Sequence, residues 1–182
     1  NCCFVFLYEY VMNVIKKIAI IGKLPPPKGG VTIHCLRLFK KINKSPKYKV
    51  SFYSLNISGK CLKDVFYIKY FMFWVLKRFF KKPNFDIIHY QLANYYGLIS
   101  IWFVCQIHSD IKLCFTIHGE GFFVRLESKK MLRNIIVYVL KRTDIIIVGN
   151  EKLKKVLFCN HITENIEVID AFLTPGEDEG GE

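Results

Sequence analysis

The chain has 182 residues, of which 52% are hydrophobic and 15% aromatic. This composition excludes an intrinsically disordered protein, and the length suits one compact domain with a buried core. The formal net charge of +12 excludes a mainly acidic protein and favours an anionic partner, namely a nucleic acid, a phosphorylated metabolite or an acidic membrane.

Strand-like and helix-like segments alternate from the amino terminus onward. In chain order we predict a strand at 17–22, a helix at 31–42, a strand at 48–55, a helix at 62–82, a strand at 86–91, a helix at 94–107, a strand at 111–118, a helix at 128–143, a strand at 144–149, a helix at 150–159 and a strand at 166–170. Several strands are continuous runs of valine and isoleucine, which is typical of strands covered on both faces. The sequence therefore predicts a single α/β domain with a doubly wound, Rossmann-like parallel sheet.

The two ends of the chain differ from this predicted domain. Residues 1–11 are apolar but lack the basic start and the small-residue cleavage site of a signal peptide, so we assign this leader no function. Residues 174–182 form an acidic, glycine-rich tail. We expect the Rossmann-like domain to cover 12–173. The uncharged stretch 92–107 is short for a membrane span and contains polar residues, which favours a buried helix.

The cysteines indicate a reducing compartment. The chain has 7 of them, an odd number, and they are scattered without a C-x-x-C pair. This pattern favours reduced thiols in a cytoplasmic protein over a disulfide framework or a zinc site.

Glycines and polar residues follow several predicted strands. In an open parallel sheet, ligands bind beyond the carboxyl ends of the strands. Gly29 and Gly30 follow the first strand and open a helix, where bare backbone and unpaired N–H groups suit a phosphate. A tight turn without a ligand fits the same pattern. The later strand ends carry polar side chains: His89, His118, Glu120, Asn150 and Glu151.

Five segments together resemble one enzyme family. They are PPPKGGVTIH, DIIHYQ, FTIHGE, TDIIIVGNEKLKKVL and VIDAFLTP. In order and spacing they resemble the amino-terminal domain of glycosyltransferase family 4, whose members have the GT-B fold of two facing Rossmann-like domains. The resemblance implies a hexosyltransferase that moves a sugar from a nucleotide-sugar donor to a glycan or lipid-linked acceptor, with retained configuration. It implies no cofactor, no metal ion, and a role in surface polysaccharide or lipopolysaccharide synthesis.

The resemblance also implies roles for single residues. His118 matches the histidine placed against the transferred sugar, which makes it the catalytic candidate. Gly29 and Gly30 would contact the donor phosphates, and Asn150 and Glu151 would line the same crevice. Each has a structural alternative: a strand-end histidine, a tight turn, or a helix cap followed by a first-turn acid.

Three further residues are candidates for substrate contacts. His34 lies one turn into the first helix, where it could reach an acceptor. His89 lies on a strand and fits a structural role as well, and Glu120 follows a glycine in a loop. His108 and His161 lie in connecting segments, so we expect them to be solvated.

The basic, aromatic stretch 62–82 fits two environments. As an interfacial helix it would bury its aromatic rings at the headgroup boundary of an anionic membrane, with its lysines at the lipid phosphates. As an ordinary helix it would pack on the core and present a basic face to solvent. The first interpretation predicts a protein peripheral to the inner face of the membrane.

The sequence departs from the family pattern after residue 175. No E-x₇-E motif or second nucleotide pocket follows, so we expect this polypeptide to need a separate donor-binding domain for transfer. A nicotinamide-dependent oxidoreductase is disfavoured because G-x-G-x-x-G is absent. The remaining alternative is a non-enzymatic basic module for a membrane or another anion. We expect no nucleic-acid partner, because no nucleic-acid motif is present.

Overall fold

A computed structural model of the chain describes residues 15–25, 29–56, 63–68, 70–91, 95–119, 122 and 129–169. In this part of the chain seven parallel strands form one sheet, in the order β3-β2-β1-β4-β5-β6-β7. The strands are β1 (Lys16–Gly22), β2 (Tyr48–Ser54), β3 (Val65–Tyr67), β4 (Ile87–Gln91), β5 (Lys112–Ile117), β6 (Ile145–Val148) and β7 (Ile166–Val168). The order reverses between β1 and β4. That reversal is the point where open α/β sheets bind their ligands.

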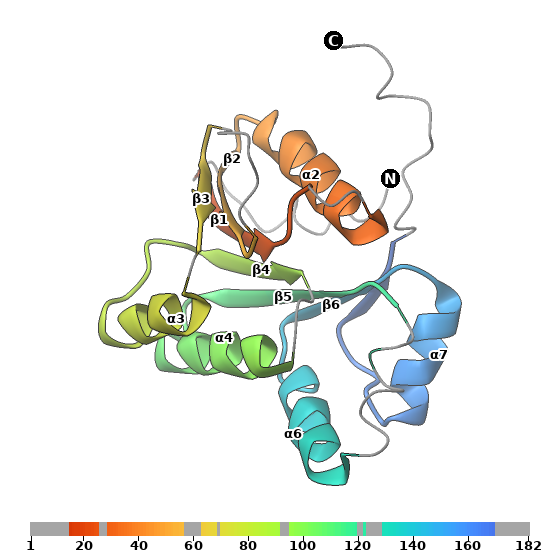
Figure 1. Ribbon diagram of the computed structural model, residues 1–182. Helices are drawn as coiled ribbons and strands as arrows, with labels where there is room; N and C mark the ends of the chain where they lie inside the picture. The colour runs from red at the N-terminus through yellow and green to blue at the C-terminus, as the bar shows by residue number, and fades with distance from the viewer. Residues whose placement is uncertain are drawn as a thin grey trace.

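Five helices of the described residues lie on this sheet. They are α2 (Gly30–Asn43), α3 (Phe71–Phe80), α4 (Tyr95–Ile107), α6 (Lys130–Leu140) and α7 (Glu151–Cys159). Figure 1 shows α2 on one side of the sheet and the neighbouring α3 and α4 on the other. α6 contacts α4, and α7 packs against β6 and β7. The prediction of a doubly wound, Rossmann-like α/β domain is therefore confirmed.

The sheet divides the core into two clusters. Cys35 and Phe39 of α2 pack on Phe52 of β2 in the smaller cluster. In the larger cluster, Leu98 of α4 and Phe115 of β5 are fully buried. Both faces of the central strands are covered, which explains why these strands are runs of apolar residues in the sequence.

The segment 62–82 differs from its prediction as a single helix. Val65–Tyr67 is instead an edge strand, β3, parallel to β2 with Val65 opposite Phe52. Valine and aromatic residues favour such a pleated, half-buried position. Asp64 precedes the strand with φ of 62°, and only Phe71–Phe80 is helical. The helical spacing of aromatics was real, but it began later than predicted.

The ends and the cysteines are only partly covered by the described residues. The predicted leader 1–11 and tail 174–182 lie outside them. Cys35 and Cys105 are buried free thiols, Cys114 is also buried, and Cys159 is exposed and free. Among the described residues, no helix is both long and apolar enough to cross a membrane.

Candidate functional site

The carboxyl ends of all seven strands lie along one edge of the sheet, since the strands are parallel. Gly29 and Gly30 follow β1, His118 follows β5, and Asn150 follows β6. β1 and β6 are separated by β4 and β5, so three strand spacings of about 14 Å in total span this row. The predicted residues therefore share one edge, which includes the switch point between β1 and β4.

A chain of buried polar side chains runs across β4 and β5 below this edge. His118 Nε2 lies 2.7 Å from Gln91 Oε1, and Gln91 Nε2 lies 2.8 Å from His89 Nε2. His89 Nε2 in turn lies 2.7 Å from Thr116 Oγ1. The strand register places Gln91 directly opposite Thr116. Side chains two residues apart on a strand share a face, so all four point to the α2 side. We call these four residues the polar relay.

The glutamine amide fixes where the protons of the polar relay lie. An amide NH₂ only donates, so His89 Nε2 accepts from Gln91 and carries its own proton on Nδ1. An amide oxygen only accepts, so His118 Nε2 donates to Gln91. When neutral, His118 therefore keeps an acceptor lone pair on Nδ1. The arrangement gives a defined donor and a defined acceptor on one imidazole.

His34 of α2 joins the polar relay from above. Its ring stands edge-on to the His118 ring, with centroids 5.1 Å apart. Burial lowers the pKa of His89 to about 3, with smaller contributions from His34 and His118. Burial likewise lowers the pKa of His118 to about 4, helped by His34. Both rings are therefore neutral near pH 7, where they form hydrogen bonds instead of carrying charge.

The absence of a side chain at Gly22, the last residue of β1, allows Gln91 and Cys35 to pack closely against the backbone of β1. A Cβ on Gly22 would lie 3.0 Å from Gln91 Cβ and 3.2 Å from Cys35 Sγ. Burial raises the pKa of the Cys35 thiol to about 12, so it packs as an inert apolar group. Gly22 is thus the residue that lets β1, α2 and β4 meet under the site.

The loop that leaves β1 is held by a residue beyond the end of β2. Asn56 Oδ1 accepts from Leu24 N at 2.9 Å, and Asn56 Nδ2 donates to Leu24 O at 2.6 Å. Ser54 Oγ donates to Asn56 O at 2.8 Å. This pair of hydrogen bonds fixes the backbone of Leu24, just after the end of β1.

Gly29 forms the N-cap of α2 with extended backbone, at φ −157° and ψ 161°. Its N–H donates to Thr32 Oγ1 at 3.0 Å. A Cβ at Gly29 would meet only Thr32 Oγ1 among described atoms, at 4.0 Å, and the first turn contains no acid. As far as the described residues show, the helix end is therefore open on this side, and no acid in the first turn opposes the positive end of the helix dipole.

The residues after β6 have a defined structural role. Asn150 caps α7, because its Oδ1 accepts from Leu153 N at 2.8 Å. Glu151 follows as the first-turn acid, on an exposed position. These contacts are those of the structural alternative, and contact of either residue with a substrate stays a prediction. Glu120 lies outside the described residues.

Sequence reasoning missed Gln91 and Thr116 as site residues. The signal was present, because IIHYQ and CFTIH place polar residues at every second position of otherwise apolar runs. Polar residues at every second position of a buried strand indicate that one face of the strand is polar and the other apolar.

Among the described residues, no group of histidine, cysteine, aspartate and glutamate has an arrangement that could hold a metal ion.

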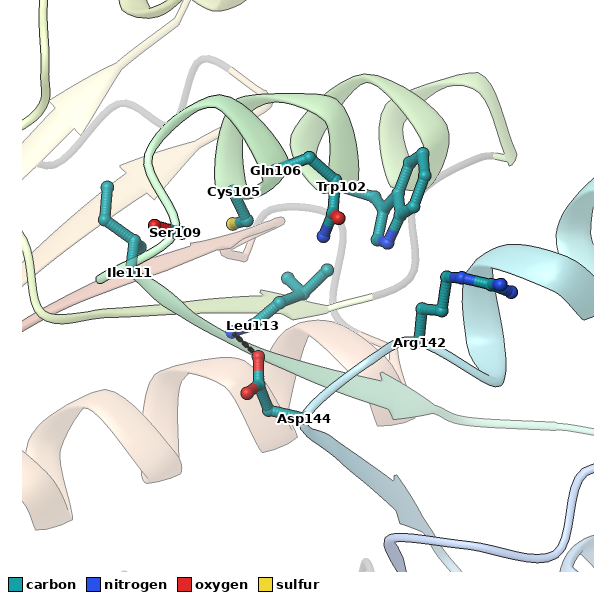
Figure 2. A pocket seen from close by; sticks show the side chains of 8 residues that line it. All are labelled: Trp102, Cys105, Gln106, Ser109, Ile111, Leu113, Arg142 and Asp144. Carbon is teal, nitrogen blue, oxygen red and sulfur yellow. Dashed lines mark hydrogen bonds between the residues drawn. The ribbon is translucent and has the colours of Figure 1, made fainter.

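The opposite edge of the sheet holds different features. His108 Nε2 donates to Arg78 O at 2.9 Å, so this histidine is partly buried and paired instead of solvated as expected. His161 is exposed, as predicted. A small cavity of about 130 Å³ lies at this edge, where Asp144 accepts from Leu113 N (Figure 2). It lies at the amino ends of β5 and β6, away from the polar relay.

Comparison with known proteins identifies the family. A family model described as glycosyl transferase 4-like matches residues 11–150, whereas no curated protein matches the chain significantly. The fold is similar to UDP-GlcNAc 2-epimerase from Methanocaldococcus jannaschii, with a TM-score of 0.57 and 14% identity, over 84% of this chain and 45% of that chain. A Rossmann-fold NAD(P)-binding family protein from Shigella flexneri matches with a TM-score of 0.48 and 14% identity, over 74% of this chain and 66% of that chain.

At 14% identity the epimerase shows the fold alone, and the chain spans less than half of that protein's length. The domain corresponds to one half of a GT-B-like fold. The family match is more specific, since it covers most of the chain and includes β1, α2, β4 and β5, which build the site. The chain belongs to the glycosyl transferase 4-like family.

Proposed function

We propose that this domain forms the acceptor-side wall of a sugar-transfer cleft. The complete enzyme would move a hexosyl group from a nucleotide-sugar donor to a glycan or lipid-linked acceptor, with retention and without a metal ion. The observation that carries this proposal is the neutral His118, held by Gln91 beside the open amino end of α2.

Sugar recognition explains the chemistry of the polar relay. A sugar hydroxyl both donates and accepts hydrogen bonds, so it pairs well with neutral polar groups of known orientation. His118 Nδ1, as an acceptor, suits a hydroxyl of the transferred sugar or the acceptor. A charged imidazolium could only donate. The lowered pKa of His118 therefore supports a role in hydroxyl recognition.

The amino end of α2 supports a role in phosphate binding. N–H groups of the first helical turn lack partners within the helix, and the helix dipole is positive there. Gly29 leaves space for an anion to approach, and Asn56 holds the preceding loop. We expect one phosphate of a nucleotide sugar to bind here.

A second domain would hold most of the donor. The chain covers 45% of the epimerase it resembles, so half of a GT-B-like fold is present in these residues. We therefore expect the 182-residue chain to transfer sugar only when a donor-binding domain is supplied, in the same or another polypeptide. The assembly of a surface polysaccharide or lipopolysaccharide is the pathway we propose.

Histidine NMR tests the location of the cleft without requiring turnover. The chain has 5 histidines, and His34, His89 and His118 lie at or below the carboxyl edge while His108 and His161 lie at the other. With ¹⁵N-histidine label, addition of UDP-GlcNAc should shift the His118 and His34 resonances most. His108 and His161 are internal controls, because they share the label and the solution but not the cleft.

Two further samples distinguish specific binding in the cleft from a nonspecific shift of the histidine resonances. In Gln91→Leu the His118 ring loses its partner, so the ligand-induced shift should shrink although α2 stays in place. UDP alone should shift the signals less than the nucleotide sugar. Equal shifts of the cleft and control histidines, or no shift with any nucleotide sugar and glycan acceptor, would contradict the proposal.

A further inference from the structure

Helix α4 has an unusual surface. It contains no charged residue, and its inner side is buried through Leu98, Ile101 and Val104. Its outer side is mostly apolar, with Ser100 and Gln106 as the polar residues, yet Tyr96 is 66% exposed and Phe103 48% exposed. A helix that is hydrophobic all round is normally buried on all sides. Something other than water is therefore expected to cover the outer side of α4.

The neighbouring helices continue this apolar surface. α3 and α6 both contact α4. Phe73 and Phe80 of α3 are 70% and 90% exposed, and Met131 of α6 is 78% exposed. We call this surface the three-helix face: the outer sides of α3, α4 and α6, on the side of the sheet opposite α2 (Figure 1). Exposed apolar side chains on three adjacent helices mark an interaction surface.

The charged side chains of the three helices are all cationic. Lys77 and Lys81 lie at the end of α3, and Lys130 and Lys141 lie at the two ends of α6; all four are exposed. The three helices contain no aspartate or glutamate. The carboxylate that follows α4, Asp110, pairs with Lys82 at 2.7 Å. The centre of the face is thus apolar and its two flanks are cationic.

We propose that the three-helix face docks onto a bilayer surface that contains anionic lipids. Aromatic and aliphatic side chains enter the headgroup boundary, while lysines on both flanks contact lipid phosphates. No helix of the described residues is long enough to cross a membrane, so α3, α4 and α6 lie in the plane of the interface. The sequence pointed only to 62–82; the structure moves the centre of the surface to α4.

A second copy of the chain fits this face less well. A two-fold symmetric interface places the same surface of both copies in contact. The lysines at the flanks of the two copies would then lie close together and repel each other, because the three helices contain no carboxylate that could pair with them. Docking on lipid also leaves the polar relay accessible, because His89 and Gln91 point to the α2 side of the sheet. The inference does not depend on sugar transfer.

Vesicle sedimentation with the full chain tests the proposal. We expect the chain to pellet with vesicles of equal parts phosphatidylglycerol and phosphatidylcholine, and to stay in solution with phosphatidylcholine alone. Lys77→Glu with Lys81→Glu should lower the partition coefficient about twentyfold or more, at about fivefold for each lost cation. Phe73→Ser with Phe80→Ser should lower it about tenfold or more.

A matched pair of substitutions on the other side of the sheet provides the control. Lys40→Glu with Lys44→Glu on α2 makes the same charge change, again in the last turn and at the C-cap of a helix. This pair should keep most of the binding. Equal loss with both lysine pairs, binding unaffected by the phenylalanine pair, or no binding to anionic vesicles overturns the proposal. So does a stable dimer that the phenylalanine pair dissociates.

Discussion

The two faces of strands β4 and β5 differ in chemistry although the same two strands build both. Toward α4, Ile88, Tyr90 and Phe115 are fully buried and apolar. Toward α2, His89 and Gln91 are also buried but polar, as is Thr116 beside them. Successive strand residues point to opposite faces, so a single strand carries a dry side and a polar side.

The difference separates what the fold requires from what the site requires. An apolar face of a strand needs only side chains that fill the available volume. A buried polar group, in contrast, destabilises the folded state by about 1–3 kcal/mol unless it is hydrogen-bonded. The polar relay meets that condition through His89, Gln91 and Thr116. Since valine at such positions would stabilise the sheet without these requirements, we infer that the polar relay is present because the cleft uses it.

The apolar face should show the largest effect on stability. Phe115→Ala removes a fully buried ring that stacks on Tyr90 at 5.9 Å between centroids. The expected loss in free energy of unfolding is about 3–5 kcal/mol, from the lost burial and the cavity left behind. Urea denaturation measures it. The same substitution at Phe103, which is 48% exposed, should cost less than about 1 kcal/mol; equal losses would contradict the division into faces.

The polar face should make stability depend on pH. His89 and His118 have pKa values lowered from 6.5 to about 3 and about 4 in the folded chain. Between those values and 6.5 the unfolded chain binds more protons, so stability is fully present above pH 6.5 and falls as the pH falls. The slope should approach about 1.4 kcal/mol per pH unit for each histidine. Denaturation midpoints measured from pH 7.5 to pH 5 test this.

Two histidine variants locate the source of that pH dependence. His118→Gln should reduce the slope, because it removes one of the two perturbed groups. His161→Gln, at the exposed position on the other edge of the sheet, should leave the slope unchanged. If the two variants behave alike, the pH dependence does not come from the polar relay.

The sequence predicted the architecture well and the polar relay only in part. Apolar runs correctly predicted strands covered on both faces, and glycine, histidine and asparagine do follow the carboxyl ends of their strands, as predicted. Ligand binding at this edge stays a prediction. The short edge strand β3 was missed because its aromatic residues also fit the helical spacing of the segment that follows. His34, His89 and His118 were candidates, but the contact of His34 with His118 depends on how α2 approaches the sheet. That approach is a property of packing, which no local pattern in the sequence contains.

A methyl group at Gly22, between Gln91 of β4 and Cys35 of α2, should have an intermediate effect on the free energy of unfolding. Gly22→Ala puts a Cβ 3.0 Å from Gln91 Cβ and 3.2 Å from Cys35 Sγ, so β1, α2 or β4 must shift. Overpacking of this kind costs about 1–3 kcal/mol. It should also change the His118 resonance, since Gln91 holds that ring. Cys35→Ala in the same chain should restore part of the stability; no recovery would place the strain elsewhere.

We expect the smallest effect on stability at Asn150, which tests whether the proposed cleft extends from β5 to β6. Asn150→Ala removes the cap of α7 and should cost about 1 kcal/mol, while Asn150→Asp keeps an oxygen that can accept from Leu153 N and should cost little. A cap that also contacts the sugar donor should respond differently in binding, because aspartate places a negative charge near the donor's phosphates. In that case Asn150→Asp weakens UDP-GlcNAc binding while stability is kept. If stability and binding both stay unchanged in Asn150→Asp, Asn150 is a cap alone and the cleft is confined to β1, β4 and β5.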